Sequence, residues 1–225
     1  MARVKLERVV TPAGVAHYPH IQTPDDYKGK QKYKCGLVVE ADNGFVALIT
    51  KKTDEAFAAA QAAVQEAIDG GELKGKALAK AKEELEVMEV HYPFEPEYSD
   101  DGEETGNIIL KTSANANFMD KKTKKLKDIK LTIFDAKNQK VDPCPNIWGG
   151  SILKLAVDIN PYHMTATHLA GVSLRLAQVQ IIELESGSGG KSEFGEEEGS
   201  YVAAAQDSSD FDDEAEDDDD ESGDF

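Results

Sequence analysis

Hydrophobic and polar positions alternate along several short segments, a pattern typical of β-strands with one buried face. Residues 33–40, 107–118 and 151–159 alternate in this way, and prolines and glycines divide the first fifty residues into short runs. Residues 130–135 are expected to return as the second strand of a hairpin. An acidic loop is expected over residues 95–104.

The same alternation predicts which side chains point outward. On residues 107–118 these are Lys111, Ser113, Asn115 and Asn117. On residues 151–159 they are Ile152, Lys154, Ala156 and Asp158. Farther along, the apolar parity shifts between Leu176 and Val179, which predicts a β-bulge.

Between these strands the apolar period changes to that of a helix. The first helix is expected to begin at Thr53, with Asp54 and Glu55 in its first turn, and to end before Gly70. A second is expected over residues 76–90. Their inner faces are Phe57, Gln61, Val64 and Ile68 in the first helix, and Leu78, Ala81, Leu85 and Met88 in the second.

Five or six strands with one helical insertion, in fewer than 190 residues, predict a mostly β fold that is a small closed or partly open barrel. We place this domain at residues 1–185. Residues 186–190 read Ser-Gly-Ser-Gly-Gly, a flexible linker, and open a separate segment over residues 186–225. We expect this segment to be a disordered acidic tail because it has too little apolar surface to fold.

Charge divides the chain at the same place. Residues 193–225 hold 16 acidic and no basic side chains, so the rest holds 27 acidic and 25 basic ones. The net charge of −18 therefore belongs mostly to the tail, and the body is nearly neutral. The overall sign does not argue against a body that binds nucleic acid.

Several classes of protein find no support in the pattern. No run of 18 apolar residues would span a membrane, and the N-terminus lacks the apolar stretch of a signal peptide. Cys35 and Cys144 lack zinc-site spacing, and we expect two reduced thiols in a cytoplasmic protein.

The motifs of common enzymes are also missing, so we expect no enzyme and no cofactor. His17 with His20, or His163 with His168, could share a metal, although scattered surface histidines are the plainer interpretation. Residues 217–220, four aspartates, could hold a hard cation weakly, as any polyanion can.

Basic residues are more informative. Residues 121–127 hold five lysines at an expected hairpin tip, Lys122 and Lys124 among them, and Lys130 follows. Lys111, Lys130 and Lys154 are expected on outward strand positions, beside amides such as Asn115. Such a surface suits a groove that follows a phosphate backbone. The hairpin lysines could instead serve only solubility.

Aromatic side chains could supply stacking surfaces for unpaired bases. Trp148 and Tyr162 are expected in loops on either side of the Lys154 strand. Trp148 could instead cap the end of the barrel. Tyr33 and Phe118 have the parity of core residues and rank lower.

These features resemble a known family. Residues 117–124 (Asn-Phe-Met-Asp-Lys-Lys-Thr-Lys), 149–155 (Gly-Gly-Ser-Ile-Leu-Lys-Leu), Pro161-Tyr162 and the terminal Gly-Asp-Phe are similar to the single-stranded DNA-binding protein of short-tailed, T-odd-type bacteriophages. The likeness covers residues from about 90 onward and is weaker before them.

The resemblance implies an OB-fold, a homodimer, and single-stranded DNA binding in phage DNA replication, recombination and repair in the cytoplasm of the infected bacterial host. By position, Lys111 matches a lysine of the DNA face and Tyr162 a stacking tyrosine. Asp224 and Phe225 match the terminal residues through which the tail contacts phage DNA polymerase and helicase-primase.

The sequence departs from the family at three positions. Met164 replaces a tryptophan, and Ser113 and Asn115 stand where the family has a lysine and a tyrosine. Trp148 could compensate for the missing rings. The alternative function is an acidic protein-interaction module, a DNA mimic or chaperone, whose body does not bind DNA.

Overall fold

The computed structural model describes residues 6–120 and 122–185. The expected linker and tail, with Asp224 and Phe225, lie outside this range, as do residues 1–5 and Lys121. The domain boundary after residue 185 therefore stays a prediction.

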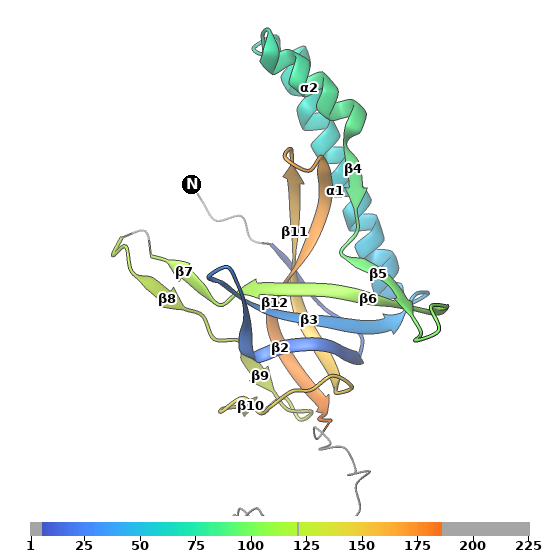
Figure 1. Ribbon diagram of the computed structural model, residues 1–225, viewed down its shortest axis with the longest axis vertical. Helices are drawn as coiled ribbons and strands as arrows, with labels where there is room; N and C mark the ends of the chain where they lie inside the picture. The colour runs from blue at the N-terminus through green and yellow to red at the C-terminus, as the bar shows by residue number, and fades with distance from the viewer. Residues whose placement is uncertain (1–5, 121, 186–225) are drawn as a thin grey trace, which may run out of the picture. The chain divides into compact units, whose positions relative to one another are not determined.

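The described residues form two helices and twelve strands, ten of the strands in one sheet (Figure 1). The helices are α1 (Gly44–Asp69) and α2 (Lys76–Val87). The strands are β1 (Glu7–Val10), β2 (Gly14–Tyr27), β3 (Lys30–Glu40), β4 (Glu89–His91), β5 (Phe94–Tyr98), β6 (Glu104–Asn115), β7 (Asn117–Met119), β8 (Leu126–Asp128), β9 (Thr132–Phe134), β10 (Lys140–Val141), β11 (Ile152–Met164) and β12 (Leu169–Glu183).

Five long strands pair in the order β2–β3–β6–β12–β11, and β11 also meets β2. The β11–β2 contact spans only two residue pairs, Ile152 with Val15 and Leu153 with Gly14, and the β12–β6 contact is equally short. The sheet curls into a barrel. This barrel is only partly open and not closed, because strand pairing at these two contacts is so short. The mostly β fold with a helical insertion is thus confirmed in its open form.

The core fills the inside of this curled sheet. Leu37, Leu110, Leu153, Leu155 and Val157 are completely buried. Each has the parity that the sequence predicts, because a strand with one buried face must alternate. The predicted bulge is also confirmed: Ala156 pairs with Gln178 and Val157 with Leu176, which leaves Ala177 as the extra residue.

The helices differ from expectation at their ends. The start predicted at Thr53 is wrong, because α1 begins at Gly44, where the Asn43 side chain accepts a hydrogen bond from the Phe45 N–H (2.9 Å). The buried face of α1 therefore includes Val46 and Ile49. The second helix ends at Val87, since the next residues extend as β4.

Two predictions for the later strands are wrong. Residues 130–135 do not pair with 107–118; within them β9 forms, parallel to β12 and antiparallel to β10, while β7 pairs with β8. Part of the expected acidic loop is β5, an edge strand beside β6.

The helical insertion lies on one side of the sheet. α1 packs against α2 and against β11 and β12, and Figure 1 shows the helices alongside the ends of these two strands where they join. Among the described residues, neither helix is long and apolar enough to cross a membrane.

Candidate functional site

Outward side chains of β3, β6 and β12 form one polar surface, which we call the basic face. It consists of Lys32 and Lys34 from β3, Lys111, Ser113 and Asn115 from β6, and Arg175 from β12. The strand register brings them together, since Asn115 lies beside Lys32, and Ser113 lies between Lys34 and Arg175. The outward direction predicted for Lys111, Ser113 and Asn115 is confirmed.

A groove of about 730 Å³ adjoins the basic face. Its walls are Leu6, Arg8, Ala114, Asn115, Ile129, Lys130, Leu131, Asp158, Asn160, Arg175, Leu176 and Ala177. Two of the predicted site residues, Asn115 and Lys130, meet here. Lys130 is exposed as expected, but it precedes β9 and is not on a strand.

The groove is positively charged because its carboxylate is already neutralised. Arg8 donates from Nε and Nη2 to the two oxygens of Asp158, at 2.7 and 3.0 Å. These hydrogen bonds hold the pKa of Asp158 below its usual value, so the pair stays ionised. Lys130 and Arg175 are then left to attract an anion.

Two lysines of the basic face form surface ion pairs whose carboxylate partners a phosphate could replace. Lys34 pairs with Asp25 on β2, and Lys111 pairs with Glu95 on β5. All four side chains remain partly exposed, and such surface pairs contribute at most about 1 kcal/mol. A polyanion can therefore compete for these lysines at small cost.

Tyr162 lies within β11 and not in a loop, which corrects the prediction. It follows the groove residue Asn160 by two positions and shares its outward parity. Its hydroxyl lies 2.6 Å from Nδ1 of His91, across Gly171, which pairs with both residues and has no side chain to intervene. Partial burial raises the pKa of the Tyr162 hydroxyl, so it stays protonated.

Trp148 lies in a loop, as predicted, and is 52% exposed. It lines a separate hollow of about 550 Å³ with His17, Tyr18 and His20 of β2. Its neighbour Ile147, 7% exposed, enters the core instead. Trp148 is thus free to contact a ligand, but none of the residues around it lines the groove of Asn115 and Lys130.

The remaining predicted lysines are apart from the groove. Lys154 points outward on β11 opposite Gln180, and is half-buried. Lys122 and Lys124 are exposed at the tip of the β7–β8 hairpin, which confirms the hairpin tip. The core position expected for Phe118 is wrong, because this ring is 47% exposed on β7; Tyr33 is buried as expected.

One of the two histidine pairs considered as metal ligands binds a carboxylate instead. His163 Nε2 and His168 Nδ1 lie 2.7 and 2.6 Å from the two oxygens of Glu84 on α2. These histidines thus hold the carboxylate of Glu84 in place. Within residues 6–120 and 122–185, no group of three or more His, Cys, Asp and Glu side chains has the arrangement of a metal site.

The two cysteines, Cys35 and Cys144, form no disulfide. Burial raises the pKa of the Cys35 thiol to about 12.

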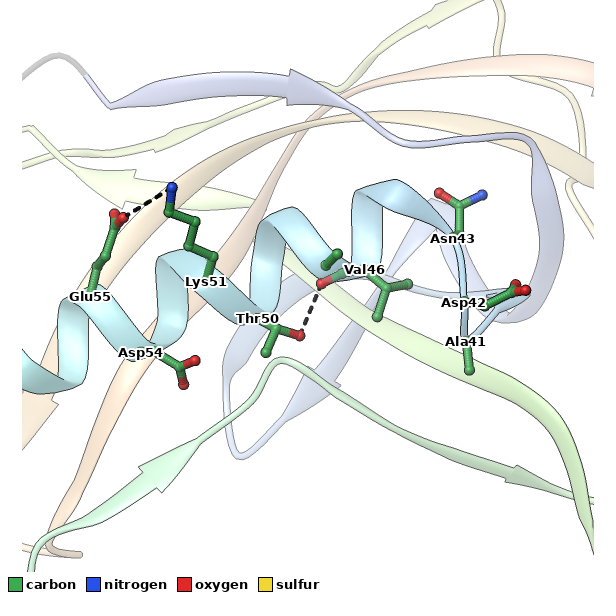
Figure 2. Close-up of a pocket in the computed structure, with 9 residues that line it drawn as sticks. Ala41, Asp42, Asn43, Val46, Thr50, Lys51, Asp54 and Glu55 are labelled. Atoms are coloured by element: carbon green, nitrogen blue, oxygen red, sulfur yellow. Dashed lines mark hydrogen bonds and ion pairs between the residues drawn. The ribbon is translucent and has the colours of Figure 1, made fainter.

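Another hollow, of about 500 Å³, lies along the first turns of α1 (Figure 2). The Thr50 hydroxyl donates to the Val46 carbonyl there (3.0 Å). Lys51 Nζ lies 3.9 Å from Glu55 Oε1. Asp42, Asp54 and Glu55 outnumber the one lysine. This hollow therefore repels phosphate and is not part of the candidate site.

Sequence reasoning missed Arg8, Lys32, Lys34 and Arg175. The signal for three of them was present, because Lys32 and Lys34 alternate with Tyr33 and Cys35, and Arg175 stands between two buried leucines. Arg8 could not be found in this way, since β1 joins the groove only through its pairing with β11.

Comparison with known proteins gives a consistent picture. Residues 11–184 match the family model described as "Single-stranded DNA-binding protein, Bacteriophage T7". The single-stranded DNA-binding protein of Escherichia phage T7 is 35% identical over 158 residues, which cover 69% of this chain and 62% of that protein. The protein of the same name from Enterobacteria phage T3 is 34% identical over 159 residues, or 69% and 63%. The chain thus aligns with less than two thirds of each relative's length.

A solved structure extends the comparison to the fold. The crystal structure of gp2.5, a single-stranded DNA-binding protein encoded by bacteriophage T7, matches with a TM-score of 0.63 and 28% identity, over 89% of this chain and all of that one. The match supports an OB-like architecture for this mostly β chain, whose described residues also form two helices. Since the family model matches most of its length, this chain belongs to the family of T7-type phage single-stranded DNA-binding proteins.

Proposed function

We propose that this protein binds single-stranded DNA with little sequence preference, in the replication, recombination and repair of phage DNA in the cytoplasm of an infected bacterium. One observation carries the proposal: Arg8, Lys130 and Arg175 line a single groove that adjoins the basic face. The DNA-binding names of the relatives support the same conclusion.

Sequence tolerance follows from the kinds of contact available. Lysine ammonium groups bind phosphate without reading bases, and the fork of Arg8 is occupied by Asp158. Tyr162 and Trp148 offer ring faces on which any unpaired base can stack. Lys111, Lys122, Lys124 and Lys154 would add phosphate contacts along the strand.

The salt dependence of binding tests the proposal. We expect the affinity for oligo-dT to fall as salt rises, with a logarithmic slope of about −0.7 per phosphate contact. A body ending at residue 185 should still bind. If that body binds no oligonucleotide, the protein is an acidic interaction module, as in the alternative function, and the proposal is wrong.

We further propose that residues 186–225 compete with DNA for the groove. Their 16 carboxylates are complementary to the basic face, and a flexible chain of this length reaches roughly 35 Å. Because the contact is intramolecular, its effective concentration can approach the millimolar range. DNA would then displace the tail and free it for protein partners.

Those partners, in this proposal, are the phage DNA polymerase and helicase-primase, with Asp224 and Phe225 as the recognition elements and the protein acting as a homodimer. A terminal ring and carboxylate give a pocket something to recognise that charge alone does not provide. The acidic stretch would serve as the less specific part of the contact.

A further inference from the structure

The β7–β8 hairpin exposes three large apolar side chains. Phe118, Met119 and Leu126 are 47%, 57% and 59% exposed, although they lie in a paired strand segment. The two strands form a sheet of their own that no other described strand joins. Exposed apolar side chains on such an arm indicate a contact surface.

The two faces of the hairpin differ in chemistry. Phe118 pairs with Lys127 on one face, whereas Met119 pairs with Leu126 on the other. Lys127 also makes an ion pair with Asp120 (2.5 Å), which holds it beside the turn. One face thus presents a ring next to the Lys127–Asp120 ion pair. The opposite face carries the apolar pair Met119–Leu126 and the polar pair Asn117–Asp128.

The hairpin continues from the groove. It follows Asn115 directly, and the N–H of Ile129, a groove residue, donates to the Ala116 carbonyl (2.6 Å). The Ala116 N–H donates to the carbonyl of Gln31 (3.0 Å), which fixes the base of the hairpin to β3. In Figure 1 the arm projects from this base on the side of the sheet away from the helices.

The tip adds positive charge along the same path. Lys122, Lys124 and Lys125 are exposed there. A strand leaving the groove past Lys130 would meet the ring of Phe118 and then these lysines. This order, a ring between cations, is that of a surface that stacks one base and holds the phosphates on either side.

We propose that the β7–β8 hairpin extends the single-strand site beyond the groove, with Phe118 stacking on a base and the tip lysines binding the adjoining phosphates. The inference rests on the proposed function, and it assigns the hairpin to DNA and not to a protein partner. The face of Phe118 and Lys127 carries the contact, and the face of Met119 and Leu126 does not.

Oligo-dT of increasing length tests this assignment with two matched variants of the full-length protein. Phe118→Ala should bind short oligomers, which fill only the groove, as the wild type does. It should bind longer ones roughly 5- to 150-fold more weakly, the usual effect of losing one stacked base. Met119→Ala truncates an exposed side chain on the opposite face and should match the wild type at every length.

The results distinguish failure of the hairpin proposal from failure of the proposed function. Equal binding of long oligomers by Phe118→Ala and wild type would overturn the inference while the proposed function stands. Equal losses in both variants would also overturn it, since the hairpin would then act as a whole and not through the ring. If the wild type binds no oligomer, the proposed function fails and the inference with it.

A fluorescence signal gives a second, direct readout. Trp148 is the only tryptophan, so a Trp148→Phe protein carrying Phe118→Trp reports on the hairpin alone. Long oligo-dT should quench this tryptophan, and short oligomers should leave it unchanged. Absence of quenching at saturating long oligo-dT would contradict stacking at this position.

Discussion

Among single residues, Tyr162 has a hydroxyl and a ring whose contributions substitution can separate. Its hydroxyl bonds to His91, which ties β11 to β4 across β12. Its ring stands on the outward side of β11, two residues beyond the groove. The hydroxyl therefore links two strands of the fold, and stacking on a base is the role proposed for the ring.

We expect Tyr162→Ala to weaken oligo-dT binding by about 1–3 kcal/mol, because a stacking surface is lost. Tyr162→Phe keeps the ring and should retain most of the affinity, while losing some stability with the His91 hydrogen bond. Titration at fixed salt, together with urea unfolding of both variants, distinguishes these effects. Equal affinity in folded Tyr162→Ala and wild type would assign the residue to structure alone.

Gly171 is required by the same crossing. A Cβ at this position would lie 2.3 Å from the His91 carbonyl oxygen, a backbone atom that cannot move aside alone. Gly171→Ala should therefore lower the free energy of unfolding by about 1–3 kcal/mol. Gly44→Ala, where a Cβ would meet nothing within 4 Å, is the matched control and should be tolerated. Urea unfolding of the two variants gives the comparison, and equal stability would contradict the close approach.

At the scale of elements, α2 is fixed to the β11–β12 turn through Glu84. This carboxylate is 6% exposed and accepts from His163 and His168. Burial alone would raise its pKa, but the two histidine hydrogen bonds and charges outweigh burial, and the net pKa is lowered. The ionised form is thus the one that the fold stabilises.

This direction has a consequence for stability against acid. Because the pKa is lower in the folded state, the contribution is complete above the ordinary glutamate pKa of about 4.3 and is lost as pH falls through the folded value. Glu84→Gln should cost about 1–3 kcal/mol at neutral pH and flatten the loss of stability in acid. Urea unfolding across pH, with the exposed neighbour Glu83→Gln as control, tests this. Identical pH profiles for the two variants would rule it out.

The strands and helices differ in how well the local sequence predicts them. The faces of β3, β6 and β11 were predictable because each strand has one buried side, and even the extra residue at Ala177 left a shift in parity. The start of α1 was missed, since Asp54 and Glu55 suit a first turn while the cap is Asn43. The partner of β9 was out of reach because its parallel pairing with β12 is non-local.

The candidate site divides in the same way. Outward lysines on regular strands, such as Lys111, followed from alternation. The meeting of Arg8, Lys130 and Arg175 did not, because it depends on β1, the segment before β9 and β12 converging in space. Tyr162 and Phe118 were misplaced since the lengths of β11 and β6 are set by tertiary pairing and not by their own residues.

Across the whole chain, a nearly neutral body precedes a strongly acidic segment, residues 193–225. If residues 193–225 compete for the groove, a protein ending at residue 192 should bind oligo-dT more tightly than full length at low salt. The gap should shrink as salt screens the carboxylates. Equal affinities at low salt would show that the segment does not compete.

Loss of Phe225 alone should act differently. This change keeps all 16 acidic side chains of residues 193–225, so DNA binding should stay as in full length. Binding to the phage DNA polymerase should fall sharply if the terminal ring is recognised. Pull-down of the polymerase with and without Phe225 measures this, and unchanged capture would show that the terminal ring is not recognised.

The groove is most directly tested by reversing one of its charges. Arg175→Glu places a carboxylate in the groove, and Lys51→Glu makes the same change in net charge on α1, away from it. We predict that Arg175→Glu binds oligo-dT much more weakly than wild type at low salt and shows a shallower salt slope, whereas Lys51→Glu stays close to wild type. Equal affinities for the two variants across the salt range would contradict single-strand binding in this groove.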